Sequence, residues 1–240
     1  MPRAQLEERF FALWQRLGAD NGAGFAAAAT RLLDLYAEPH RAYHNLTHLE
    51  DVLAKLDWAQ STMMMNGEIS GLDGTERRRL FDTIELALFY HDAVYNAQAK
   101  DNEAQSRELM KRDAATFGID AGYIEDAARL IDTTAHHARA ARFDEKIMSD
   151  CDLAILGADE ASFKKYDDGI RAEYAHVPAP LYAVGRAKVL QGFLDMPHIF
   201  KTRAFADVFD APARRNLGGA LAPQSPLPIL GRLKKLIFKN

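Results

Sequence analysis

Apolar residues recur every three or four positions along most of the chain. The first stripe consists of Leu6, Phe10, Leu13 and Leu17, and it ends at the glycine-rich segment 18–24. Positions with this spacing lie on one face of an α-helix, so each stripe predicts a helix that buries that face. Further helices are predicted from the capping-box sequence Thr47 to Glu50 onward, and over 25–36, 77–90, 101–117, 120–136, 160–174, 180–194 and 211–221. Runs that alternate with period two are absent, which predicts an all-α fold without a sheet.

The sequence shows no internal repeat and no linker before the proline-containing stretch 223–228. We therefore expect a single helical-bundle domain over residues 1–222, followed by a short tail over 223–240. The tail is basic and amphipathic. Its apolar residues share one helix face, and they are Ile229, Leu233, Leu236 and Ile237. Its charge comes from the basic residues Arg232, Lys234, Lys235 and Lys239. Such a segment either contacts anionic lipid or a partner groove, or it docks on its own domain or frays.

Composition limits the classes of function. The 240 residues are 48% hydrophobic, enough for one substantial core, and the net charge of −4 argues against binding a nucleic acid polymer through bulk charge. A nucleotide-sized substrate needs only a local cation or metal and is not excluded. The lone Cys151 cannot form an internal disulfide, and charges occupy the N-terminus where a signal peptide has an apolar core. No stretch approaches the roughly 20 apolar residues of a membrane span. We expect a cytoplasmic protein, and the sequence does not indicate its oligomeric state.

Two histidine-containing motifs carry the clearest chemistry. The sequence Tyr-His-Asn-Leu-Thr-His contains His44 and His48 four residues apart, so on a helix both side chains project from one face. A later apolar run, 86–90, leads directly into His91 and Asp92. Two polar neighbours at the end of a predicted buried helix indicate a specific role. Imidazole nitrogens and carboxylate oxygens are ligands that divalent cations bind.

A second acidic pair, Asp150 and Asp152, precedes another apolar stretch and supplies a further candidate ligand. The order His, His-Asp, Asp along the chain is typical of a metal-dependent phosphohydrolase site. A bound divalent metal lowers the pKa of water from about 15.7 to near 7 and so supplies a nucleophile that can attack an anionic phosphoester. Because nitrogen and oxygen ligands are mixed, the metal can be Mn, Mg, Zn, Fe, Co or Ni, with one or two ions bound.

The combined motifs resemble a known family. Four residues of this chain resemble the metal-binding quartet of the HD-domain phosphohydrolase superfamily, and they are His48, His91, Asp92 and Asp152. The segment from Tyr43 to His48 also resembles the histidine motif of the mammalian cyclic-nucleotide phosphodiesterases. That resemblance implies that His44 is the general acid on the leaving oxygen and that His48 is a metal ligand. The chain from His44 to about Leu221 looks like a bacterial group of predicted metal-dependent phosphohydrolases of this superfamily. This resemblance is carried by the sequence segments 89–95, 101–103, 150–157 and 170–174.

The resemblance also orders the remaining ligand candidates. In the superfamily pattern the last aspartate stands directly before a leucine, which favours Asp152 before Leu153 and leaves Asp150 as a helix cap or a partner of a ligand. Some members use an additional histidine between the His-Asp pair and the last aspartate. His136 is the better positional match for a contact with metal or metal-bound phosphate, and its alternative is a partner of the helix dipole. His137 is expected to be solvated.

Further residues are candidates for substrate chemistry. At the acidic helix start, Glu103 either is an ordinary N-terminal acid or accepts a proton as a general base, and the adjacent Asn102 is a candidate substrate contact. Arg171, favoured over Arg186, is a candidate phosphate contact because a guanidinium presents a fork of donors, although it could equally be structural. Tyr174 either belongs to a helix core stripe or stacks on a substrate ring.

From these residues we expect a metal-dependent phosphohydrolase, a phosphomonoesterase or phosphodiesterase, whose partner is a nucleotide or another small phosphorylated metabolite. Two alternatives stay open. The first is a non-catalytic sensor that keeps the HD fold and binds metal and nucleotide. The second is a di-iron oxygenase of the same superfamily, which requires extra histidine ligands.

Overall fold

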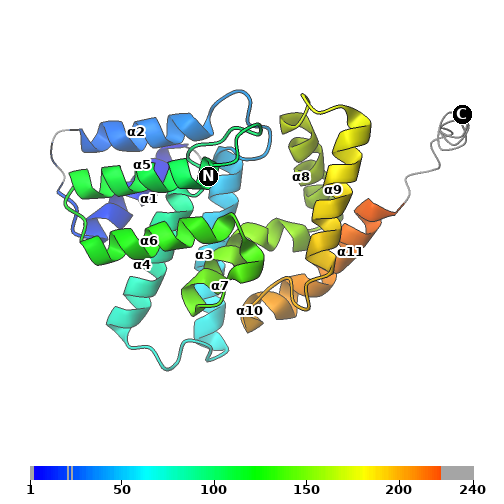
Figure 1. Ribbon diagram of the computed structural model, residues 1–240. Helices are drawn as coiled ribbons and strands as arrows, with labels where there is room; N and C mark the ends of the chain where they lie inside the picture. The colour runs from blue at the N-terminus through cyan, green and yellow to red at the C-terminus, as the bar shows by residue number, and fades with distance from the viewer. Residues whose placement is uncertain (1–2, 21, 23, 223–240) are drawn as a thin grey trace, which may run out of the picture.

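The computed structural model describes residues 3–20, 22 and 24–222, and every regular element within them is helical (Figure 1). The predicted all-α fold is confirmed. The longer helices are α1 (Arg3–Arg16), α2 (Phe25–Tyr36), α3 (Leu46–Met65), α4 (Gly74–Tyr90), α5 (Asn102–Thr116), α6 (Ala121–Thr134), α7 (Phe143–Leu153), α8 (Glu160–Glu173), α9 (Ala179–Leu194) and α11 (Ala211–Leu221). Shorter segments are the 3-10 turns His137–Arg139 and Ala154–Gly157, α10 (Arg203–Phe205) and the π-helical Ala206–Asp210. The basic tail predicted over 223–240 lies outside the described residues.

The starts of α3 and α4 differ from the sequence prediction because other residues cap these helices. Helix α4 begins at Gly74 and not at Arg77, because Asp73 caps it by accepting hydrogen bonds from the backbone N–H of Thr75 and Glu76 at 2.7 and 2.8 Å. At α3, the capping box predicted to start at Thr47 is not used. The side-chain oxygen of Asn45 accepts from the Thr47 backbone N–H at 2.9 Å, and the helix begins at Leu46.

Helix α7 is absent from the prediction. Polar residues interrupt its buried positions, so no continuous apolar stripe marks the helix. The buried residues are Ile147, Met148, Ser149, Asp150, Cys151 and Leu153. The helix start is fixed by Glu145, whose carboxylate accepts from the backbone N–H of Ala141 and Arg142 at 2.9 and 3.0 Å. Its last turn carries Asp152.

Helix α4 lies at the centre of the larger group of helices. Each residue from Phe81 to Tyr90 is buried, which is typical of a helix enclosed on all sides. Helices α1, α3, α5, α6 and α7 all contact it. Helices α8, α9 and α11 form a second group on the other side of α3 and α7, with α9 packed on α11 (Figure 1). None of the helices in the described part of the chain is both long and apolar enough to cross a bilayer.

Candidate metal centre

Three helix ends bring the predicted ligands together. His48 lies in the first turn of α3, His91 caps the C-terminus of α4, and Asp152 lies in the last turn of α7. One ligand atom of each residue lies within 4.8 Å of the other two, so the three could hold a metal ion. The Nε2 atoms of His48 and His91 are 3.1 Å apart, and Asp152 Oδ1 lies 3.4 and 3.5 Å from them.

Asp92 is the fourth predicted ligand, and it contacts the same two imidazoles. Its Oδ2 lies 3.3 Å from His48 Nε2 and 3.2 Å from His91 Nε2. The imidazole side chains are almost inaccessible, at 2% and 1%, whereas the side chains of Asp92 and Asp152 are each 16% exposed. The carboxylates therefore form the accessible edge of the cluster.

The charges of the cluster fit a cation. Burial raises the pKa of both aspartates, but the neighbouring His91 and the other imidazoles lower it more, so that the pKa of each carboxyl lies below its usual range. Burial lowers the pKa of His48 and of His91, and the adjacent aspartates raise it above the ordinary value of an imidazole. Two ionised carboxylates thus hold positive charge beside them, which a divalent cation can supply in place of protons.

The orientation of His91 supports the same interpretation. Its Nδ1 lies 2.8 Å from the carbonyl oxygen of Leu88, which can only accept, so Nδ1 carries the proton and donates. In the neutral ring Nε2 then has a free lone pair directed at His48 Nε2. Backbone carbonyls commonly fix metal-binding histidines in this way.

The histidine that reaches the cluster from the 3-10 turn is His137. Its Nε2 lies 3.4 Å from Asp152 Oδ2 and its Nδ1 lies 3.1 Å from Ser149 Oγ, and the side chain is 15% exposed. His136, the expected contact, is exposed, although it lines the adjoining cavity. The chain leaves the helical conformation at His136, with φ −148° and ψ 59°, and so turns the following ring inward. Burial lowers the pKa of His137 and so favours the neutral, ligand-competent ring.

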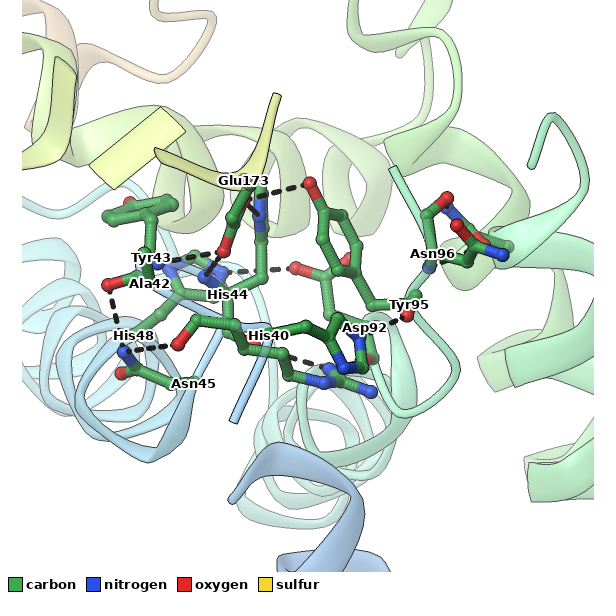
Figure 2. Close-up of polar contacts among 12 residues, drawn as sticks. His40, Ala42, Tyr43, His44, Asn45, His48, Asp92, Tyr95, Asn96 and Glu173 are labelled. Atoms are coloured by element: carbon green, nitrogen blue, oxygen red, sulfur yellow. Dashed lines mark hydrogen bonds and ion pairs between the residues drawn. The ribbon is translucent and has the colours of Figure 1, made fainter. Parts of the chain in front are cut away.

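His44 is held by a carboxylate that the sequence analysis had not assigned a role. Glu173, at the end of α8, accepts from the backbone N–H of Tyr43 and His44 at 2.7 and 2.9 Å through Oε1. Its Oε2 lies 2.8 Å from the Tyr95 hydroxyl and 2.7 Å from His44 Nδ1 (Figure 2). Burial raises the pKa of Glu173, but the His44 ring and the two backbone donors lower it to about 2. The ionised carboxylate therefore orients the His44 ring through Nδ1.

Arg41 joins the two histidine-containing segments. Its side chain is fully buried, and its guanidinium donates to the carbonyl oxygens of His44, Asp92 and Ala93 at 3.2, 2.6 and 2.8 Å. These contacts fix the backbone that carries His44 against the backbone that carries Asp92.

A cavity of about 730 Å³ opens beside the cluster, lined in part by Asp92, Asp152, His44 and His137. Its volume is in the range of sites that hold small organic ligands, about 300–1,000 Å³. Glu103, the predicted general base, also lines the cavity.

The other predicted substrate contacts have mixed placements. Tyr174 lines the cavity. Asn102 also lines the cavity, but its side chain is bound to the backbone of Asn96. Its Oδ1 accepts from the Asn96 N–H at 3.1 Å and its Nδ2 donates to the Asn96 carbonyl oxygen at 3.0 Å, so the side chain fixes a loop. Arg171 lies outside the lining and donates to the carbonyl oxygens of Tyr174 and Val177 at 2.8 and 3.2 Å. The cavity is lined by Arg186, the arginine that was not favoured.

Asp150, predicted to be a helix cap or a partner of a ligand, binds a distant segment of the chain. Its buried carboxylate accepts from the backbone N–H of Lys201 and Thr202 at 2.9 and 2.8 Å and from the Thr202 hydroxyl at 2.8 Å. Burial raises the pKa of Asp150 to about 6 against the opposing effect of these donors. The residue holds the segment before α10 against α7.

Comparisons of the chain with protein-family models, curated proteins and solved structures give no match. The site is therefore interpreted from its own geometry. Two ionised carboxylates and the oriented His44 border one cavity, and two buried imidazoles lie directly behind the carboxylates.

Proposed function

We propose that the protein is a metal-dependent phosphohydrolase of the HD-domain type, acting on a nucleotide or another small phosphorylated metabolite. The observation that carries this proposal is the convergence of His48, His91, Asp92 and Asp152 at the edge of a cavity of about 730 Å³. Within that superfamily the same four residue types, in this order, form the metal site. The resemblance in sequence and the convergence in space both support the proposal.

The four residues would hold the metal, and His137 is a further neighbour of Asp152. A divalent cation bound there would act as a Lewis acid on the phosphoryl group and would lower the pKa of the water that it coordinates. The protein's part is to fix the ligands at three helix ends and to keep His91 Nε2 free through the contact of Nδ1 with Leu88. Mixed nitrogen and oxygen ligands suit Mn, Zn, Fe, Co, Ni or Mg.

His44 is the proposed general acid. Its Nδ1 is held by Glu173, which leaves Nε2 available to donate a proton to the leaving oxygen. The ionised Glu173 stabilises the charged imidazolium and keeps the ring in one orientation, with the Tyr95 ring stacked on it at a centroid distance of 4.3 Å. A carboxylate behind a histidine is a common arrangement for this task.

Replacement of Asp92 by Asn tests the proposal. The variant keeps the shape of the side chain but loses its charge, so we expect metal content and turnover to fall together by at least about 100-fold. Metal content is measured by mass spectrometry, and turnover is measured on a panel of nucleotides and sugar phosphates with Mn, Mg, Co and Zn. The matched control is Asp168→Asn, whose side chain is 65% exposed on α8 and ion-paired with Lys164.

Full turnover in Asp92→Asn at an equal folded fraction would refute the metal-dependent mechanism. Saturable binding of a nucleotide by the wild-type protein without any product would instead favour the non-catalytic sensor. The two outcomes are distinguished by measuring ligand binding and product in the same samples.

A further inference from the structure

Helix α9 carries large apolar side chains that do not pack into the core. It buries one residue, Leu190, whereas Leu181, Val184 and Val189 are 66%, 72% and 50% exposed. A single exposed apolar residue needs no explanation, but several on one helix indicate a surface that contacts a ligand or a partner.

Part of this helix forms a wall of the cavity beside the metal centre. Leu181, Gly185 and Val189 recur at a spacing of four and therefore lie on one face, and all three line the cavity. Val184 lies off that face and outside the lining. Because Asp92 and Asp152 line the same cavity, it has an acidic, metal-binding wall and an apolar wall.

Two polar side chains of α9 that line the cavity, those of Tyr182 and Arg186, are inaccessible or paired within the protein. Arg186 pairs with Asp167 at 2.9 Å, and its guanidinium lies 5.0 Å from the centre of the Tyr166 ring. The Tyr182 hydroxyl has no hydrogen-bond partner among the described residues, but it is buried and therefore not accessible from the cavity. This wall therefore offers few hydrogen bonds to a hydroxyl-rich group such as a sugar, and an apolar group loses little by lying against it.

We infer that the ligand of this cavity is an organic phosphate whose non-phosphate part is an apolar aromatic or aliphatic group. That group lies along Leu181, Gly185 and Val189, with the phosphate directed to the metal centre. The placement of the phosphate at the metal centre rests on the proposed function. The apolar half rests on the composition of α9, and it assigns these three residues as determinants of specificity.

Calorimetric binding to the Mn-loaded full chain provides the test, with methyl phosphate, 1-naphthyl phosphate and glucose 6-phosphate as probes. We expect 1-naphthyl phosphate to bind at least about tenfold more tightly than methyl phosphate, since an apolar pocket discriminates by that factor or more for even one methylene group. Glucose 6-phosphate should bind no more tightly than methyl phosphate. Equal affinity for the naphthyl and methyl esters would overturn the inference.

Two variants of similarly exposed residues on the same helix localise the effect. Leu181→Asn should reduce the naphthyl preference several-fold, and the matched control Val184→Asn should leave it unchanged. Gly185→Leu should also weaken naphthyl binding, because the leucine side chain would occupy part of the cavity. The fold should tolerate this change, since a Cβ at Gly185 meets no atom within 4 Å. An equal loss in Leu181→Asn and Val184→Asn would overturn the assignment to the cavity face.

The test also separates this inference from the proposed function, because product is assayed independently of binding. A naphthyl preference without hydrolysis of any ester supports the apolar wall and contradicts the phosphohydrolase. Hydrolysis of methyl and naphthyl esters with equal kcat/KM supports the phosphohydrolase and contradicts the apolar wall.

Discussion

Replacement of Glu173 by Gln should change both stability and turnover. The carboxylate accepts four hydrogen bonds, from the backbone N–H of Tyr43 and His44, from His44 Nδ1 and from the Tyr95 hydroxyl. A glutamine keeps one acceptor oxygen, but its amide nitrogen must face two of these donors. The substitution therefore removes a charge and creates unsatisfied donors in a buried place.

The magnitude follows from the titration of this group. Burial raises the pKa of Glu173, and the His44 ring with the backbone donors lowers it from 4.5 to about 2. The difference corresponds to about 3 kcal/mol of stability from the ionised carboxylate near pH 7. Because the folded-state pKa is depressed, this contribution is complete above the unfolded-state pKa and declines as the pH falls toward the folded-state pKa. About 1.4 kcal/mol should remain near pH 3.

Urea unfolding at about pH 7 and pH 3 measures these free energies. Glu173→Gln should lose about 3 kcal/mol at the higher pH and roughly half of that at the lower pH. The control Glu160→Gln, an exposed glutamate at the start of the same helix, should change little. Turnover should fall by about 100-fold or more, because His44 loses its orienting partner. A loss below about 1 kcal/mol near pH 7, or one that does not shrink in acid, would show that Glu173 is not the ionised anchor described above.

Three further predictions concern the metal centre and its support. Saturating Mn or Zn, at about 100 times the Kd, should stabilise the wild-type protein by about 2.7 kcal/mol in a thermal melt and should have no such effect on His91→Ala. His137→Ala should weaken metal binding by about 10-fold or more in a chelator competition, whereas His136→Ala should not, and the reverse order would restore the sequence-based preference. Asp150→Ala leaves the donors of Lys201 and Thr202 unpaired, so urea unfolding should show a loss of about 2–3 kcal/mol.

Regular helices were predictable because their apolar stripes are uninterrupted. The bounds predicted for 25–36 and 211–221 agree with α2 and α11. Helix α7 was missed because the buried face includes Ser149 and Asp150 among apolar residues. Asp150 can be buried because its carboxylate accepts hydrogen bonds from Lys201 and Thr202. These partners lie about fifty residues further along the chain. Local periodicity carries no information about such a partner.

The residues of the candidate metal centre could be chosen from the sequence for a different reason. A metal site restricts the residue type at each position, so His48, His91, Asp92 and Asp152 are recognisable from their kinds and order before any packing is known. The choice between His136 and His137 depended instead on the backbone angles of His136, where the helical conformation ends. A sequence motif does not determine that angle.

Two residues that escaped prediction, Arg41 and Glu173, share one task, which is to hold the backbone beside a candidate ligand or beside His44. Arg41 binds the carbonyl oxygens of Asp92 and Ala93, and Glu173 binds the N–H groups of Tyr43 and His44 across 130 and 129 residues. An anchor of this kind needs only a donor or an acceptor, so many residue types can serve, and packing decides which one does. The distance between the His48 and His91 rings therefore depends on buried contacts outside the ligand set. A change that loosens such a contact should disturb metal binding while every ligand remains in the sequence.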